Sequence, residues 1–207
     1  MLTPPASLSA DLLVSVLAEH WRLDARSLRY RAVGWGSHHW EVTDQAGRRW
    51  FVTADELPNK RESLSESLDI AYDRLRRALA AATRLRASGC EFVVAPVPAA
   101  GGEPLARAGR DFAVALYPFV SGQCFEWGTF SSQEHRDAVL DLVVAVHVAP
   151  PAVCAKALAD RYVVPLRDEL EAVLERGTER TREAGPWTRP MTRLVSANEA
   201  AVAALFR

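Results

Sequence analysis

Residues 33–42 read Val33-Gly-Trp-Gly-Ser-His-His-Trp-Glu-Val42, and the two glycines in this stretch lie between two predicted strands. Residues 27–33 alternate apolar and basic side chains, which is the pattern of a half-buried strand. Residues 38–43 predict a second strand, and residues 49–54 predict a third beyond an Asp-Gln-Ala-Gly turn. A Gly-x-Gly bend lets backbone N–H groups approach a nucleotide's phosphates, although a plain hairpin with two glycines has the same pattern. The stretch therefore predicts an antiparallel meander.

The rest of the chain predicts an N-terminal helix that Ser9 can cap, one long helix, two more strands and a helical region. Apolar residues spaced by three and four predict a helix from residue 68 to Gly89, whose glycine is a natural stop. Strands are predicted at residues 92–95 and 110–117. Beyond Gly122 the predicted elements are all helices, at residues 131–147, 165–177 and 191–206. Strands followed by helices predict an α+β fold, with domains at residues 1–120 and 121–207.

The composition is that of an ordinary soluble globular protein. The chain has 207 residues, of which 49% are apolar and 25% charged, and its net charge is −1. This balance argues against a nucleic-acid or membrane-surface partner, and no apolar run is long enough to span a membrane. The start lacks the features of a secretory signal, and the three cysteines are far apart. A cytoplasmic location without a disulfide framework or zinc site is therefore expected.

Several segments in order resemble the aminoglycoside phosphotransferase family, whose fold is similar to protein kinases and choline kinases. These segments, within residues 25–150, are Val33–Val42, Gly47–Asp55, Phe92–Val97, Phe112–Gly122 and Leu140–His147. The resemblance implies a kinase-like N-terminal lobe followed by an incomplete helical C-terminal lobe. It also implies ATP with magnesium as cofactors and a small-molecule hydroxyl as phosphate acceptor. Arginine and alanine dominate over lysine, as in many bacterial proteins from GC-rich genomes.

The resemblance also implies two groups of nucleotide-binding residues. The glycine turn, which would cover the phosphates, comprises Gly34, Trp35, Gly36 and Ser37. The inter-lobe hinge would hold adenine through the carbonyl of Pro118 and an N–H group from either Phe119 or Val120. Without the family context, the hinge is also readable as a strand that ends in a proline turn.

The family's lysine on the third strand has no counterpart here. Thr53 is the residue at that position, and threonine carries no charge. The only lysines are Lys60, in a predicted polar loop at residues 58–67, and Lys156, far along in the helical region. Asp69 and Asp73 are candidate acidic partners on the long helix, and plain exposed helix carboxylates are the alternative.

Catalytic and metal-binding residues are not predicted from this sequence. The family carries His-Gly-Asp or His-Gly-Glu followed by asparagine, and none of the five histidines is followed by glycine and an acid. The string Glu134-His-Arg-Asp137 is expected on a solvated helix face, because acids complement the start of a helix. His38 and His39 should point to opposite faces of a strand and so cannot chelate together. His147 is expected to pack in the core.

Two functions follow from these observations. The first is the N-terminal portion of an ATP-dependent phosphotransferase acting on a small-molecule hydroxyl, expected to be inactive as this fragment. The alternative is a catalytically inactive kinase-like binding or scaffold module, which the absent strand lysine favours. An incomplete helical lobe should expose apolar surface, notably over residues 191–206, so self-association is expected.

Overall fold

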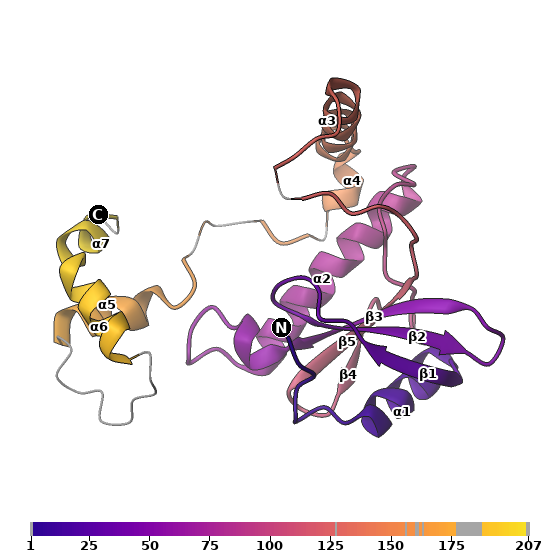
Figure 1. Cartoon of the computed structure of the whole chain (residues 1–207), viewed down its shortest axis with the longest axis horizontal. Coiled ribbons are helices and arrows are strands. Elements are labelled where there is room, and N and C mark those ends of the chain that lie inside the picture. The colour runs from indigo at the N-terminus through magenta and orange to yellow at the C-terminus, as the bar shows by residue number, and fades with distance from the viewer. Residues whose placement is uncertain are drawn as a thin grey trace. The chain divides into compact units, whose positions relative to one another are not determined.

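The structure is a computed structural model that describes residues 2–126, 128–155, 157–159, 162, 164–176 and 188–205. The chain forms two compact units (Figure 1). The first unit contains residues 1–60 and 67–159, and the second contains residues 61–66 and 160–207. Lys156, Gly177 and Phe206, which the sequence analysis names, lie outside the described residues. No helix in the described ranges is long and apolar enough to cross a membrane.

The first unit is built on a five-stranded antiparallel sheet with the order β1-β2-β3-β5-β4. The strands are β1 (Ala25–Tyr30), β2 (His38–Asp44), β3 (Arg49–Glu56), β4 (Ala106–Ala108) and β5 (Phe112–Pro118). The predicted meander of the first three strands is confirmed. The β2–β3 turn is closed by Gly47, whose φ is 79°, a conformation that glycine adopts at no steric cost.

Helix α1 (Ala10–Trp21) covers one face of the sheet. Its first turn is capped by Ser9, whose hydroxyl accepts the Leu12 N–H. Leu13 and Leu17 are fully buried against Val42 of β2 and the neighbouring strands. Burying one such leucine contributes about 1.5–3 kcal/mol, so this apolar face fixes α1 to the sheet.

Helix α2 (Leu68–Ala87) lies against the opposite face, since it packs on the alternate residues of β5. Its apolar side chains meet Ala113 and Ala115, together with Leu57 of the short 3-10 helix η1 (Leu57–Lys60). The β2–β3 half of this face is different. There His39, Phe51 and Thr53 are half-buried and belong to neither hydrophobic core. We call this half the open face of the sheet.

The segment at residues 92–95 is not the predicted strand. Its backbone turns instead, with the Val93 N–H bonded to the Cys90 carbonyl. The guanidinium of Arg86 donates to the carbonyls of Glu91 and Val93, at 2.6 and 2.9 Å. These two carbonyls are therefore not available to a partner strand. The edge of the sheet is formed by β4, which the sequence did not predict. The predicted polar loop at residues 58–67 likewise begins inside η1.

The helical region begins as predicted and departs from the prediction further along. Helix α3 (Gln133–His147) is capped by Ser132, and α4 (Pro151–Cys154) follows it. The second unit contains α5 (Arg167–Arg176), α6 (Thr188–Ala197) and α7 (Glu199–Leu205), so the helix expected from residue 191 onward is divided at Asn198. His147 is exposed rather than packed in the core, because α3 buries none of its residues.

Candidate functional site

The glycine turn joins β1 to β2 and has a backbone that only glycine adopts freely. Gly34 and Gly36 have φ values of 72° and 82°, and an L side chain in this region costs about 1–2 kcal/mol. Between them Trp35 projects into solvent, with 95% of its surface exposed. Ser37 follows and leads into β2. Because its glycines carry no side chains, a ligand can approach the backbone of the turn closely.

Two nitrogen-bearing side chains lie against this turn. A Cβ atom built on Gly34 would be 3.0 Å from Nε2 of His39, and one built on Gly36 would be 3.7 Å from Nζ of Lys60. His39 comes from β2, whereas Lys60 is the last residue of η1. The space beside Gly34 and Gly36 is therefore bordered by an imidazole and an ammonium group.

Asp55 holds Ser37 and Lys60 together. The Ser37 hydroxyl donates to Oδ1 of Asp55 at 2.6 Å, and the Lys60 ammonium lies 2.7 Å from the same oxygen. The Asp55 side chain is 9% exposed and that of Lys60 is 30% exposed. Both donors of this Ser37–Asp55–Lys60 cluster thus converge on one shielded anionic oxygen.

His39 supports the turn as a neutral ring. Its ring stacks on Phe51 with centroids 5.2 Å apart and planes inclined by 24°. Burial lowers the pKa of His39 below its ordinary value of 6.5, opposed by the nearby Asp55 carboxylate. Its Nδ1 atom is buried and has no hydrogen-bond partner among the residues that the structure describes. His38, on the opposite face as predicted, instead bonds Glu56 and the Tyr30 hydroxyl at 3.0 Å each.

Thr53, the residue matched to the position of the strand lysine, lies on β3 at the open face, and its side chain interacts with Tyr117. Burial is the main reason that the pKa of Tyr117 rises to about 12, so this phenol stays protonated. Thr53 is adjacent to His39 on β2 in the strand register. Thr53 therefore lies beside a neutral phenol and an uncharged imidazole rather than beside a charged side chain.

The hinge residues follow β5 directly. The Phe119 N–H donates to the Arg49 carbonyl at 3.4 Å, and the Arg49 guanidinium lies 3.6 Å above the Phe119 ring. Val120 is 62% exposed. Because the Phe119 N–H is engaged within the sheet, Val120 becomes the better of the two alternatives for a donor to a bound base.

A charged cluster on the open face surrounds Glu41. Oε1 of Glu41 lies 2.7 Å from Arg49, and Oε2 lies 3.3 Å from Arg31 and also pairs with Arg29. The hydrogen bond from Arg29, reinforced by Arg49, holds the pKa of Glu41 below its ordinary value of 4.5, against the opposing effect of burial. Three guanidinium groups around one carboxylate leave this region positively charged.

The acidic residues of α2 do not pair with Lys60. Asp69 pairs with Arg107, and Asp73 lies 2.6 Å from Arg76. The lysine's carboxylate partner comes from β3 instead, which sequence reasoning missed. A signal was present, because Asp55 is two residues after Thr53 and therefore shares its face of the strand.

The described residues do not form a ready-made set of metal ligands at this site. Within the described ranges, no three carboxylate, histidine or cysteine side chains gather as metal ligands, and Asp55 is already bonded by Ser37 and Lys60. The string Glu134-His-Arg-Asp137 lies at the start of α3, where Gln133 donates to Asp137 at 2.7 Å.

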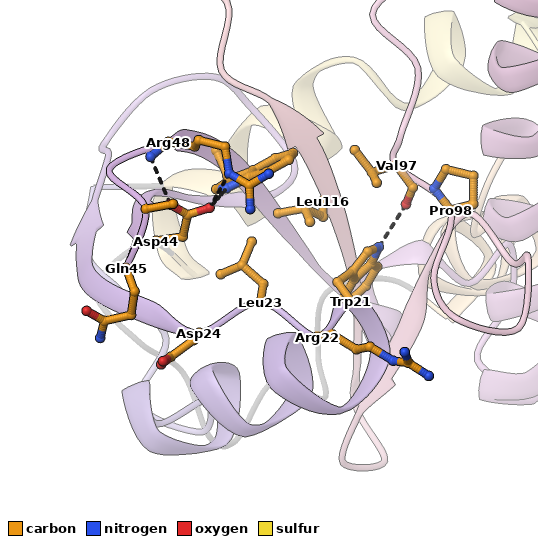
Figure 2. A pocket seen from close by; sticks show the side chains of 12 residues that line it. Trp21, Arg22, Leu23, Asp24, Asp44, Gln45, Arg48, Val97, Pro98 and Leu116 are labelled. Carbon is orange, nitrogen blue, oxygen red and sulfur yellow. Dashed lines mark hydrogen bonds and ion pairs between the residues drawn. The ribbon is translucent and has the colours of Figure 1, made fainter.

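A cavity of about 370 Å³ lies on the α1 side of the sheet (Figure 2). Its carboxylate Asp44 accepts hydrogen bonds from the backbone and side chain of Arg48, both at 2.8 Å, and from the Trp50 indole at 3.1 Å. The Trp21 indole donates to the Val97 carbonyl at 2.8 Å, and Figure 2 shows this bond at the cavity wall. These polar groups satisfy one another, so the cavity is best explained as a packing feature.

Comparisons with solved structures define the class of fold. The chain is similar to spectinomycin phosphotransferase APH(9)-Ia in complex with ADP and spectinomycin, with a TM-score of 0.62 and 13% identity over 96% of this chain and 56% of that one. An AMP-bound complex of the same phosphotransferase gives a TM-score of 0.56 and 13% identity over 95% and 55%. This chain has the fold of a kinase-like small-molecule phosphotransferase, which confirms the resemblance at the level of the fold.

The chain spans about half the length of these two solved structures. Neither a protein-family model nor a curated protein sequence matches it. The likeness therefore concerns the arrangement of the backbone.

Proposed function

We propose that this chain is the nucleotide-binding part of an ATP-dependent phosphotransferase that acts on a small-molecule hydroxyl. Residues 1–120 form its nucleotide-facing lobe and hinge, and residues 121–207 form part of a helical lobe. The observation that carries the proposal is the glycine turn with Lys60 against it, at the open face of a kinase-like sheet. The ADP and AMP held by spectinomycin phosphotransferase support a nucleotide as the ligand.

The two ends of the open face determine the orientation of the bound nucleotide. Its phosphates face Gly34, Trp35, Gly36 and Ser37, where backbone N–H groups and the Lys60 ammonium can donate to them. Its base faces Pro118–Val120, where the Pro118 carbonyl accepts from the base and the Val120 N–H donates to it. Thr53 lies between these ends and makes no charged contact with the phosphates.

The chain by itself is proposed to bind nucleotide without transferring a phosphoryl group. Its sequence holds no His-Gly-Asp or His-Gly-Glu motif to orient an attacking hydroxyl. Magnesium supplies charge neutralisation in phosphoryl transfer, but the described residues offer no ligand set for it. We therefore expect no ADP release above background with hydroxylated antibiotics, sugars or amino alcohols. Clear turnover in a coupled assay would contradict this expectation.

The hinge assignment is tested by adenosine binding to Val120 variants. Val120→Pro removes the proposed donor N–H, whereas Val120→Ala keeps it and controls for the lost side chain. One hydrogen bond contributes about 0.5–1.5 kcal/mol, so calorimetry should show roughly 2- to 12-fold weaker adenosine binding for the proline variant alone. Equal adenosine affinity of the two variants would show that the Val120 N–H does not contact the base. If the unaltered protein binds neither adenosine nor ATP, the proposed function is rejected.

A further inference from the structure

A lysine lies beneath the glycine turn although the third strand carries none. Lys60 belongs to η1, which follows β3 directly, and it is one of only two lysines in the sequence. Its ammonium lies 2.7 Å from Asp55 and 3.7 Å from a Cβ built on Gly36. The site therefore has a lysine–carboxylate pair in which β3 supplies the carboxylate and η1 supplies the ammonium.

The backbone around Lys60 is held in place on two sides. Leu57, at the start of η1, is fully buried in the core under α2. The guanidinium of Arg74 on α2 donates to the Lys60 carbonyl at 2.6 Å. Since both contacts involve α2, the position of the lysine is fixed by the packing of the helix against the sheet.

The donors at this site are arranged for an anionic oxygen. The Ser37 hydroxyl and the Lys60 ammonium both contact Oδ1 of Asp55. An ammonium group has three donors, and Asp55 is its only ion-pair partner in the part of the chain described. The lysine can therefore keep its contact with Asp55 and still donate to a phosphate oxygen under the turn.

Other cations near the open face are less suited to this task. Arg29, Arg31 and Arg49 surround Glu41. His39 touches the turn, but burial lowers its pKa and keeps the ring neutral at pH 7. Lys60 is thus the cation that the described structure places against Gly36.

We propose that Lys60 supplies the positive charge that binds the nucleotide's phosphates, with Asp55 holding its ammonium beneath the glycine turn. This inference rests on the proposed function, because it requires a nucleotide on the open face. It predicts that the phosphates contribute to affinity through Lys60 and that adenosine binding is independent of it.

Calorimetry with ATP, ADP and adenosine tests the inference on the full chain. Loss of a charge-assisted hydrogen bond costs at least about 10-fold in affinity. Lys60→Met should therefore weaken ATP and ADP binding about 10-fold or more and leave adenosine binding within about 2-fold. Lys60→Arg should retain most of the ATP affinity. Arg110→Met removes a positive charge from an exposed turn on the far edge of the sheet and should change nothing.

A second variant guards against misfolding, because Lys60→Met leaves Asp55 shielded and unpaired. The double variant Asp55→Asn/Lys60→Met removes both charges and should show the same selective loss of ATP affinity. An undiminished preference for ATP over adenosine in the Lys60 variants would overturn the inference while leaving the proposed function intact. An equal fall for ATP and adenosine would assign Lys60 a structural role and also overturn it. Failure of the unaltered protein to bind any of the three would reject both proposals.

Discussion

At the scale of single residues, Gly34 and Gly47 allow backbone strain to be measured separately from steric contact with a neighbouring side chain. Both have positive φ, but a Cβ on Gly34 would meet His39 at 3.0 Å, whereas a Cβ on Gly47 meets nothing within 4 Å. Gly47→Ala should therefore lower the free energy of unfolding by about 1–2 kcal/mol, from backbone strain alone. Gly34→Ala should lower it further in urea unfolding. Equal losses would mean that His39 moves aside without cost.

The Glu41 cluster makes a pH-dependent contribution to stability. Arg29 and Arg49 hold the folded-state pKa of Glu41 below its ordinary value, so the contribution is present above pH 4.5 and is lost as the pH falls through the folded-state pKa. Glu41→Gln should be less stable than the unaltered protein at pH 7, and the difference should shrink toward pH 3. Glu91→Gln, at an exposed position, is the matched control. A difference that persists unchanged to pH 3 would contradict the assignment.

At the scale of elements, the turn after α2 depends on one arginine. Arg86 binds the carbonyls of Glu91 and Val93, so Arg86→Met should leave them to solvent. We expect faster amide hydrogen exchange at residues 89–93, measured by mass spectrometry, with α1 and the sheet unaffected. Arg86→Lys, which replaces the planar guanidinium with a compact ammonium on a shorter side chain, should give an intermediate rate. Unchanged exchange in Arg86→Met would show that the turn is held by its own backbone.

The elements that the sequence predicted correctly are those with local signals. The β1–β3 meander has alternation and turn residues, and α2 and α3 have helical spacing with serine caps. Strand β4 has three residues, too few for a periodic pattern, and exists through its pairing with β5. Residues 92–95 had the composition of a strand, but the side chain of Arg86 binds the Val93 carbonyl and that of the preceding Glu91.

The candidate site was predictable to the same local extent. The glycine turn was visible in residues 34–37, because its two glycines are separated by a single residue in the sequence. The Asp55–Lys60 pair was not, because it depends on η1 turning back toward β3, and that segment was interpreted as a polar loop. The packing of Leu57 under α2 and the hydrogen bond from Arg74 to the Lys60 carbonyl fix this turn.

At the scale of the whole molecule, α3 presents an uncovered apolar surface. Several of its large apolar side chains are exposed, namely Leu140, Leu142, Val143 and Val144. We expect self-association, with sedimentation coefficients that rise with protein concentration. Leu140→Gln combined with Val144→Gln, four residues apart on one face of the helix, should reduce it. A constant monomeric sedimentation coefficient for the unaltered protein at all concentrations would contradict this expectation.

Because lysine is scarce in this chain, the Lys60 amine can be labelled selectively. An acyl-phosphate derivative of ATP transfers its acyl group to an amine that lies beside the bound phosphates, and few amines in this chain could compete. The sequence offers Lys60, Lys156 and the terminal amine, so peptide mass spectrometry would read out the modified position directly. The protein is thus suited to covalent labelling at a single lysine, with excess ATP expected to protect it.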